Sequence, residues 1–551
     1  MTGFAIGFLS LSLKKESGEV VTCVAWLVAL AWVAACGAPW LAKNLQRVRA
    51  EALTVLALFA AALALRLALP WGPVNFGEAE RLAPLWSRTV PSCGMMCTVP
   101  TIAAIAQAMG LSLAAILRAG GPLFGALGVA GAYAFARGAG LRRESGVLAA
   151  MIVLGWPAHL HYSTSMTFTV EGVALWSLAF GVAHARTGAL PLRSVLLAAL
   201  TVLGVYARPE YRLLLVPLAV VVLAAPWAWR ERALFAALLG VGLYAYLRYL
   251  PPSDMMRYAS GSSKMFFPHL LGDEELSPYW WLYLGAAGLV AGLTTRSRIA
   301  TSVALALSCA TLVWVYSFLA SEANPRWAQW RYYASLVPFV AVAVALLGDR
   351  LGSPAGAPWR RAVVPALLTL AALTPVAQLG ALRRVEDQQA EFAWIRATAP
   401  RVLARRDDVL VLANNDHPGL AQVRIEGTPR MALATLFGRL DWPSVCEPEA
   451  SRLRLRDLER VVARCPESVS PERTAVYLGL SRDDARLASV RERYRLVPIE
   501  ERTMNVAMSA TMINRQCPAL TSDPNGEIIG LSAPDCRVTL GWYRLEAKAA
   551  P

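Results

Sequence analysis

Charge alternates along this chain in a way that few folds can accommodate. Up to roughly residue 381, apolar segments follow one another, and the loops between them are alternately basic and charge-balanced. Six alternate loops hold 15 basic residues: Lys43, Arg47, Arg49, Arg137, Arg142, Arg143, Arg186, Arg193, Arg230, Arg232, Arg296, Arg298, Arg350, Arg360 and Arg361. Because Lys and Arg accumulate in loops that stay in the cytoplasm, this alternation orients every segment at once. The pattern predicts a polytopic membrane protein with a water-facing tail.

The predicted fold class is an α-helical polytopic membrane protein of about 12 transmembrane helices with a C-terminal extracytoplasmic α/β domain. We place the spans near residues 20–42, 51–70, 112–136, 146–160, 168–185, 190–206, 213–228, 233–249, 279–294, 299–319, 333–348 and 362–380. The domains are then an N-terminal region with an additional helix (1–50), a transmembrane domain (51–382) and the extracytoplasmic domain (383–551). A composition of 56% hydrophobic residues agrees, since a soluble globule could not cover that much apolar surface.

Most of the net charge of +15 comes from the part of the chain predicted to lie in the membrane. Residues 381–551 hold 25 basic against 23 acidic side chains, so the excess lies mostly in the short cytoplasmic loops. Basic residues there are expected to anchor helices to anionic membrane lipids. We therefore predict membrane lipids as partners and no nucleic acid.

Cysteine usage fits this orientation. Cys23, Cys36 and Cys309 fall in predicted spans, whereas Cys93 and Cys97 fall in the first outer loop and Cys446, Cys465, Cys517 and Cys536 in the tail. Outer compartments are oxidising, so these even-numbered sets indicate disulfides, and four tail cysteines allow three connectivities. The alternative is that they are unpaired buried thiols.

The tail reads as one small α/β domain. Predicted strands at 409–413, 475–480 and 538–546 are separated by helical stretches near 386–404, 454–465 and 482–494. This order favours a mixed or parallel sheet covered by helices. None of the strands is followed by a glycine-rich nucleotide fingerprint, so no nucleotide cofactor is expected.

The first outer loop carries one candidate catalytic group. Glu78 and Glu80 follow the second span closely, and a surface helix is predicted at 98–110. A partly desolvated glutamate has a raised pKa and serves as a general base toward a hydroxyl. We assign this role to Glu78 and read Glu80 as a solvated loop charge, which is also the alternative for Glu78.

A second candidate group lies around residues 159–172. Glu171 falls inside a span, where an ionisable group is costly and faces a polar cavity or a partner. His159 and His161 precede it at the outer end of another span. Two histidines at this spacing could bind a metal, but without a third ligand we expect them to lie at headgroup level with no ligand.

Arginines form the third candidate group. Arg208, Glu210 and Arg212 end one span, and Arg326 and Arg331 precede another. Guanidinium groups suit phosphate because they bind it bidentately. Arginines at membrane edges also act as snorkelling anchors. We favour anion binding for Arg208 and Arg331, and an anchoring role for the others, including Arg257 and Lys264 of the long outer loop.

Three of these segments resemble a known family, the polytopic GT-C glycosyltransferases that use polyprenyl-phosphate sugars. Phe76-Gly77-Glu78-Ala79 resembles their Gly-Asp-Glu-Ala loop, with Gly77 where an aspartate is often found. Tyr206-Ala207-Arg208-Pro209-Glu210 is similar to their Arg-Pro-Glu turn, and Arg331-Tyr332 followed by Pro338 to their late Arg-Tyr segment. The layout is like that of bacterial and dolichyl-phosphate-mannose-dependent members over residues 51–400.

The resemblance implies a transferase on the outer face of the inner (plasma) membrane. Its donor would be a polyprenyl-phosphate-linked sugar, and its acceptor a lipid, a cell-envelope glycan or a protein. Glu78 would be catalytic, and Arg208, Glu210, Arg331, Tyr332 and Glu171 would bind substrate. A divalent metal stays open as a cofactor, with no residue assigned to it.

Two other classes of function fit the same pattern. A transporter or flippase of an anionic lipid-linked substrate would use Glu171 and the outer arginines to line a path, although no internal repeat typical of such proteins is evident. A catalytically silent membrane assembly subunit would fit the glycine at position 77.

Overall fold

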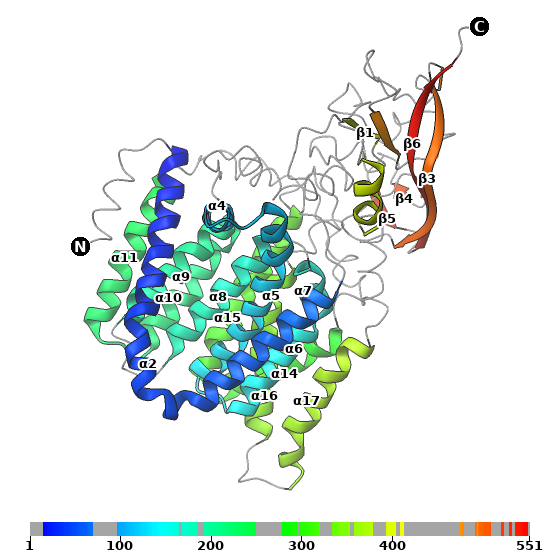
Figure 1. Cartoon of the computed structure of the whole chain (residues 1–551). Coiled ribbons are helices and arrows are strands. Elements are labelled where there is room, and N and C mark those ends of the chain that lie inside the picture. The colour runs from blue at the N-terminus through cyan, green and yellow to red at the C-terminus, as the bar shows by residue number, and fades with distance from the viewer. Residues whose placement is uncertain are drawn as a thin grey trace.

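The computed structural model describes most of the predicted membrane region and parts of the tail. The described residues are 15–69, 96–164, 168–185, 192–248, 278–295, 297–319, 333–352, 358–377, 393–403, 408–412, 474–478, 491–492, 494–507, 520–522, 528–531 and 535–548. A helical bundle carries a small β-sheet at one end (Figure 1). We call this the sheet end.

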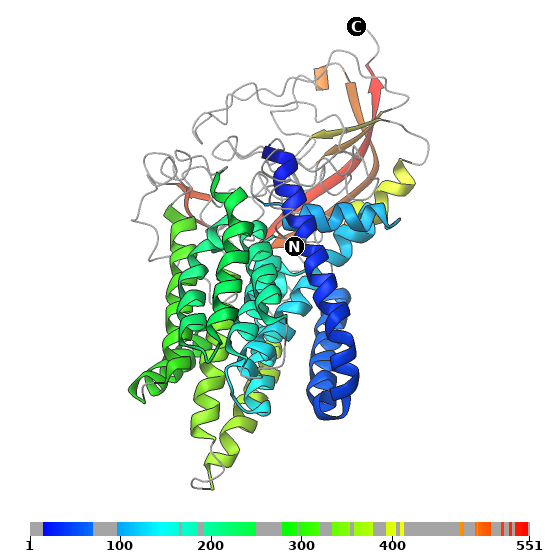
Figure 2. The same ribbon diagram turned by 90° about the vertical axis from the view of Figure 1, so that its left-hand side faces the viewer.

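Helices form wherever the sequence is continuously apolar. They are α2 (Lys15–Ala68), α4 (Thr98–Ala108), α5 (Leu113–Gly138), α6 (Arg143–Gly155), α7 (Pro157–Tyr162), α8 (Phe168–His184), α9 (Arg193–Ala207), the 3-10 helix η1 (Pro209–Leu214), α10 (Leu215–Ala224), α11 (Trp229–Arg248), α14 (Tyr279–Thr294), α15 (Arg298–Leu319), α16 (Val337–Leu351) and α17 (Arg360–Ala377). Each of the predicted apolar segments overlaps one of these helices. Helix α2 holds two of them, in two arms that meet at the end of the bundle opposite the sheet (Figure 2).

The predicted number of about twelve spans is not confirmed. Four helices of the described chain are long and apolar enough to cross a membrane: Val20–Pro39, Arg49–Ala68, Leu113–Gly138 and Tyr333–Leu351. Several others, such as the 15 residues of α9, fall short of the roughly 20 residues that a perpendicular span requires. The bundle is therefore a multi-pass membrane structure whose helices differ in length.

Small residues let the central helices approach closely. A Cβ atom added to Gly138 of α5 would lie 2.2 Å from the carbonyl oxygen of Gly181 in α8. Backbone contact at this distance leaves space for a hydrogen atom only, as in other helix pairs packed in membranes. Helix α5 thus packs along α8 at the centre of the buried core.

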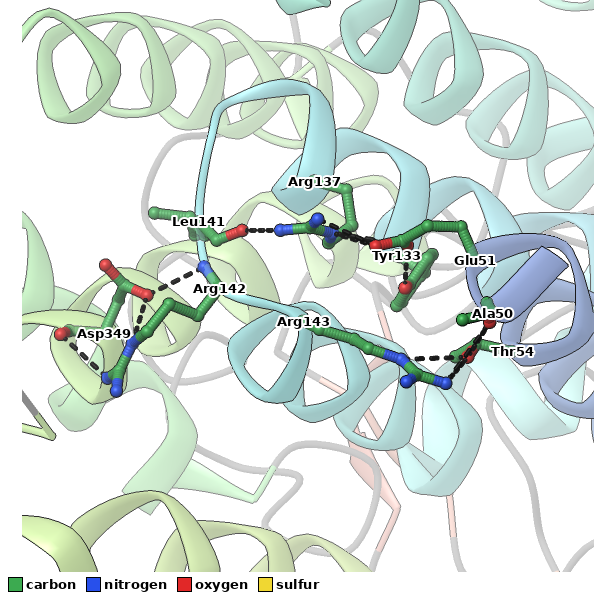
Figure 3. Close-up of polar contacts among 9 residues, drawn as sticks. All are labelled: Ala50, Glu51, Thr54, Tyr133, Arg137, Leu141, Arg142, Arg143 and Asp349. Carbon is green, nitrogen blue, oxygen red and sulfur yellow. Dashed lines mark hydrogen bonds and ion pairs between the residues drawn. The ribbon is translucent and has the colours of Figure 1, made fainter. Parts of the chain in front are cut away.

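At the end opposite the sheet, Arg142 joins two helix termini (Figure 3). Its backbone N–H and its Nε donate to Asp349 Oδ1 at 2.9 and 3.0 Å, and its Nη1 donates to the carbonyl of Gly352 at 2.7 Å. The N-terminus of α6 thereby gains a carboxylate and the C-terminus of α16 gains a cation, which suits both helix dipoles.

The second arm of α2 is fixed to the same end of the bundle. Glu51 accepts hydrogen bonds from Arg137 Nη2 at 2.8 Å and from the Tyr133 hydroxyl, and Arg143 Nη2 donates to the carbonyl of Ala50 at 3.2 Å (Figure 3). These arginines were expected to anchor the helices to lipid. They pair with carboxylates and helix ends of the protein, because these groups converge where the helices end, and the contact with lipid stays a prediction.

Arg193 has a similar role at another loop of this end. Its guanidinium is 2.6 Å from Glu231 Oε2, donates to the carbonyl of Ala185 at 2.8 Å and lies 4.0 Å from the centre of the Trp227 ring. The described residues of the basic loops thus lie at one end of the bundle, whereas α4 lies at the sheet end (Figure 1). That separation agrees with the predicted alternation of loops.

The tail contains a four-stranded mixed sheet of order β1-β2-β6-β3. Strands β1 (Asp408–Leu412) and β2 (Thr474–Leu478) pair in parallel, and β6 (Asp535–Ala547) runs antiparallel to both β2 and β3 (Tyr494–Ala507). The sequence predicts β1, β2 and β6 but not β3, whose charged residues 500–502 mask its strand character. Strands β4 (Leu520–Ser522) and β5 (Ile528–Leu531) form a separate pair.

A helix at 393–402, inside the predicted 386–404 stretch, packs on this sheet. Thr398 Oγ1 accepts a 2.7 Å hydrogen bond from Trp542 Nε1, both buried. Burial and the nearby Arg118 guanidinium of α5 lower the pKa of Arg396. The helix therefore lies close to the N-terminal end of α5. The predicted helix at 454–465 lies outside the described residues, as does 482–490 of the next one.

The described cysteines follow the predicted division. Cys97 is disulfide-bonded, whereas Cys23, Cys36 and Cys309 of the helices form no disulfide. Cys536 lies on β6, and its side chain is not among those described. Cys93, Cys446, Cys465 and Cys517 lie outside the described residues, so the predicted tail bridges stay a prediction.

Candidate functional site

The turn after α9 places Arg208 and Glu210 at the sheet end. Arg208 precedes Pro209, which disfavours helical geometry at the preceding residue, and its backbone is extended with φ −151° and ψ 118°. The side chain of Arg208 is only 4% exposed, and its Nη1 lies 3.9 Å from Glu210 Oε1. The structure thus buries a guanidinium next to a carboxylate where α9 ends at the sheet end.

Tyr211 connects this turn to the beginning of α8. Its hydroxyl donates to the carbonyl of Thr169 at 3.1 Å, and its ring packs on Gly172, where an added Cβ would lie 2.4 Å from Cε2. Glu171 lies between these two contacts and is fully buried, in the first turn of α8. Two predicted substrate-binding segments, around Glu171 and around Arg208, are therefore in contact.

A second buried cluster lies where α2 meets α7. Arg66 Nε donates to Ser163 Oγ at 2.7 Å, its Nη1 to the carbonyl of Ala62 at 3.0 Å, and its Nη2 to His159 Nδ1 at 2.9 Å. Arg66, His159 and Ser163 all have an exposed fraction of 0%. A guanidinium cannot accept a hydrogen bond, so Nδ1 of His159 accepts and the ring proton sits on Nε2.

The structure buries both histidines inside the protein. His159 and His161 were predicted to lie at headgroup level with no ligand, which stays a prediction; His159 contacts Arg66 of α2 and lies close to Gly128 of α5. His161 stacks edge-on against Tyr162, with ring centroids 4.7 Å apart. The part of the chain that the structure describes holds no group of three or more potential metal ligands.

Several buried polar atoms at this end have no hydrogen-bond partner among the described residues. They include His159 Nε2, His161 Nδ1, Thr101 Oγ1 and Thr169 Oγ1. Buried polar groups are ordinarily hydrogen-bonded, so such atoms indicate places where further polar groups enter. The sheet end is therefore suited to a polar ligand.

The proposed base Glu78 lies outside the described residues, as does Glu80. The described chain stops at Leu69, shortly after Arg66, and resumes at Met96 just before α4. Helix α4, predicted as 98–110, is fixed to α9, since the Thr98 hydroxyl donates to the carbonyl of Leu203 at 2.7 Å. Both ends of the loop that carries Glu78 are thus held at the sheet end.

Arg331 and Tyr332 also lie outside the described residues. The next residue, Tyr333, is buried and packs against Trp156, with ring centroids 6.2 Å apart. Trp156 directly precedes α7, which carries His159. Tyr333 therefore contacts the start of α7, the helix to which Arg66 is hydrogen-bonded.

Arg66 and Ser163 were not predicted as residues of the site. Arg66 could have been noticed, since it is a charged residue within the apolar segment 51–70, and such residues in membranes face the bundle interior. Ser163 gave no signal, because its role depends on how α7 folds back.

The fold matches known membrane protein structures over nearly its whole length. A crystal structure of ArnT from Cupriavidus metallidurans bound to undecaprenyl phosphate is 12% identical, with a TM-score of 0.52 over 89% of this chain and 98% of that chain. The chain therefore shares its fold with this ArnT. The apo state of the same ArnT gives a TM-score of 0.50 over 90% of this chain and 98% of that chain, also at 12% identity.

The other comparisons do not extend this likeness in fold. The apo oligosaccharyltransferase of Archaeoglobus fulgidus is 12% identical over 69% of this chain and 68% of that chain, but its TM-score of 0.39 is too low for an argument. No protein-family model and no curated protein matches the chain. The predicted resemblance is confirmed as a resemblance in fold.

Proposed function

We propose that this GT-C chain is a glycosyltransferase that moves a sugar from a polyprenyl-phosphate donor to a lipid, glycan or protein acceptor. The observation that supports this proposal most is the buried guanidinium of Arg208 at the sheet end, beside the segment that contains Glu171. A buried cation requires an anionic partner, and a lipid phosphate that enters between helices would supply one beyond Glu210. The ArnT structure that shares the fold is bound to undecaprenyl phosphate, which supports this donor class.

The reaction would be a single displacement at the anomeric carbon. Glu78 would take the proton of an acceptor hydroxyl, the acceptor oxygen would bond to the anomeric carbon, and the bond from that carbon to the phosphate oxygen would break. The polyprenyl phosphate leaves as an anion, which Arg208 or Arg331 would stabilise in a water-poor site. Glu171, Glu210 and Tyr332 would contact the sugar or its phosphate.

The proposed location follows from charge. The end opposite the sheet holds the basic loops, so the positive-inside rule places it in the cytoplasm and places the sheet on the outer face of the inner membrane. A polyprenyl-phosphate sugar would then be used outside the cytoplasm, where acceptors of the cell envelope are found.

The first test of this function is donor binding. The protein is purified in nanodiscs, and undecaprenyl phosphate binding is measured by native mass spectrometry. Arg208→Gln removes a buried charge-assisted hydrogen bond and is expected to weaken binding by about tenfold or more. Arg212→Gln, on the 3-10 helix that follows Arg208 and only partly buried, is the matched control. Equal binding by both variants and the parent would contradict the phosphate role of Arg208.

The second test is transfer. Glu78→Gln nearly keeps side-chain size and is expected to lower transfer from an undecaprenyl-phosphate sugar by about a hundredfold, with binding unchanged. Glu80→Gln is the matched control and should do little. If both variants and the parent transfer equally fast, Glu78 is a loop charge. Binding and flipping of the lipid without any transfer would favour a transporter, and neither activity would favour a silent assembly subunit.

A further inference from the structure

The cluster of Arg66, His159 and Ser163 links two segments that the proposed reaction must hold at a fixed separation. Arg66 ends the second arm of α2, and the loop that carries Glu78 begins only a few residues later. Ser163 and His159 belong to α7 and the turn that leads into α8, 97 and 93 positions along the chain. The hydrogen bonds of one side chain therefore join the start of the base-bearing loop to the α7–α8 turn.

The geometry of the cluster requires an arginine. Its planar fork presents Nε, Nη1 and Nη2 to three acceptors in different directions, at 2.7, 3.0 and 2.9 Å. A lysine ammonium at the end of a longer flexible stem could not satisfy all three at once. Because one of the acceptors lies on α2 itself, the guanidinium is fixed to its own helix while it holds α7.

Helix α5 forms a close wall behind this cluster. A Cβ atom on Gly125 would lie 2.4 Å from Arg66 Nε and 2.5 Å from Ser163 Cβ, and one on Gly128 would lie 3.0 Å from His159 Nε2. The glycines thus provide the space that the three side chains occupy. Any displacement of the cluster toward α5 is blocked.

The path continues from the cluster to the proposed phosphate site. Ser163 is followed within a few residues by Thr169, whose carbonyl accepts from the Tyr211 hydroxyl at 3.1 Å. Tyr211 belongs to η1, the 3-10 helix that begins directly after Arg208. Arg66 is therefore connected through hydrogen bonds and a short stretch of chain to the turn that carries Arg208 and Glu210.

We propose that Arg66, His159 and Ser163 are positioning residues that hold the end of α2 and α7 in a fixed arrangement with the Arg208 turn. This role rests on the proposed function. Positioning affects the alignment of reacting groups more than the affinity for substrate, and a misplacement of about 1 Å costs up to a hundredfold in rate. Loss of the cluster should therefore lower kcat and leave KM nearly unchanged.

The test compares paired histidine variants. His159→Leu removes the acceptor of Arg66 Nη2, whereas the side-chain carbonyl of His159→Gln can still accept that bond. With the undecaprenyl-phosphate sugar that the parent transfers, His159→Leu and Ser163→Ala should lower kcat by about tenfold or more with KM within about threefold, and His159→Gln should recover most of the rate. His184→Leu is the matched control, since His184 pairs with Ser302 at 3.1 Å at the other end of α8.

Amide hydrogen exchange provides a readout that is independent of transfer. In His159→Leu, exchange should rise at residues 157–164 and 206–214, and in His184→Leu it should stay at the parent level there. Unchanged exchange, unchanged kcat, or a His159→Gln variant as slow as His159→Leu would each overturn the inference. If the parent binds undecaprenyl phosphate but transfers no sugar, the proposed function fails, and exchange at 206–214 alone decides whether the cluster positions the Arg208 turn.

Discussion

Gly172 offers a direct test of how tightly the Arg208 turn is held. It follows Glu171 in α8, and an added Cβ would lie 2.4 Å from Tyr211 Cε2 and 2.6 Å from Cδ2. Ordinary contacts between carbon atoms are about 3.5–4.0 Å, so Gly172→Ala requires the ring to move by roughly 1 Å. The ring is fully buried and its hydroxyl is bonded to Thr169 of the same helix, so it has no free direction in which to move.

Three contributions set the size of the effect. Overpacking of a buried contact costs about 1–3 kcal/mol, and strain or loss of the Tyr211 hydrogen bond costs about 0.5–1.5 kcal/mol. Replacing a helical glycine by alanine returns about 0.5–1 kcal/mol. We therefore expect Gly172→Ala to lower the free energy of unfolding by about 0.5–4 kcal/mol, the net of these opposing effects.

The free energy of unfolding can be measured by denaturant titration in mixed micelles. Gly240→Ala is the matched control, because Gly240 lies in helix α11 with nothing within 4 Å of an added Cβ, and it should be neutral or slightly stabilising. A Tyr211→Val background lacks the ring atoms that clash. In this background, Gly172→Ala should lower the free energy of unfolding less than in the parent, by about 1 kcal/mol or more. If Gly172→Ala is as stable as Gly240→Ala, the close packing of Tyr211 on α8 is wrong.

Three further predictions concern the rest of the chain. Arg142→Met keeps the aliphatic stem but loses the bonds to Asp349 and α16, and since these side chains are 35% and 24% exposed we expect a cost of only about 1–2 kcal/mol, against no change for the exposed Arg49→Met. A reporter fused after Arg383 should be active only outside the cytoplasm and one at Arg232 only inside; the reverse would place the candidate site in the wrong compartment. Thiol labelling of the denatured, unreduced protein should modify Cys23, Cys36 and Cys309 but not Cys97, Cys446, Cys465, Cys517 or Cys536, and full labelling would refute the predicted bridges.

Helix positions could be predicted because a lipid environment forces every span to bond its own backbone. Runs of apolar residues alone therefore located α5, α8 and α16 to within a few residues. The number of spans could not be predicted as well. Whether a 15-residue helix such as α9 crosses the membrane depends on neighbours and local bilayer thickness, which the sequence does not encode directly.

Some features of the candidate site could be predicted from the sequence and others could not. Glu171 and Arg208 could be found because a charge at the end of an apolar run is costly without a role, and the structure buries both. The link between them could not be predicted. It consists of the hydrogen bond from the Tyr211 hydroxyl to the carbonyl of Thr169. Every residue has a backbone carbonyl, so the sequence does not show which one accepts such a bond.

Strand β3 shows a different limit. Its stretch 500–502 reads as three charged residues, which is atypical of a strand core. As an edge strand it exposes these residues, and charged side chains on an edge prevent pairing with other chains. The irregularity between Pro498 and Glu500 also lies on this edge, where a proline removes no required hydrogen bond.

The two ends of the bundle use arginine in opposite ways, and the difference bears on function. At the end opposite the sheet, Arg137 and Arg142 pair with the carboxylates of Glu51 and Asp349, so their charges are balanced (Figure 3). At the sheet end, Arg66 is fully buried, and its hydrogen bonds go to a serine, a histidine ring and a carbonyl, all of them neutral. A buried cation held only by neutral groups retains its charge and creates a positive potential in a low-dielectric region. Arg66 and Arg208 are thus two buried guanidinium groups at the sheet end, and the proposed stabilisation of a departing lipid phosphate would use such groups.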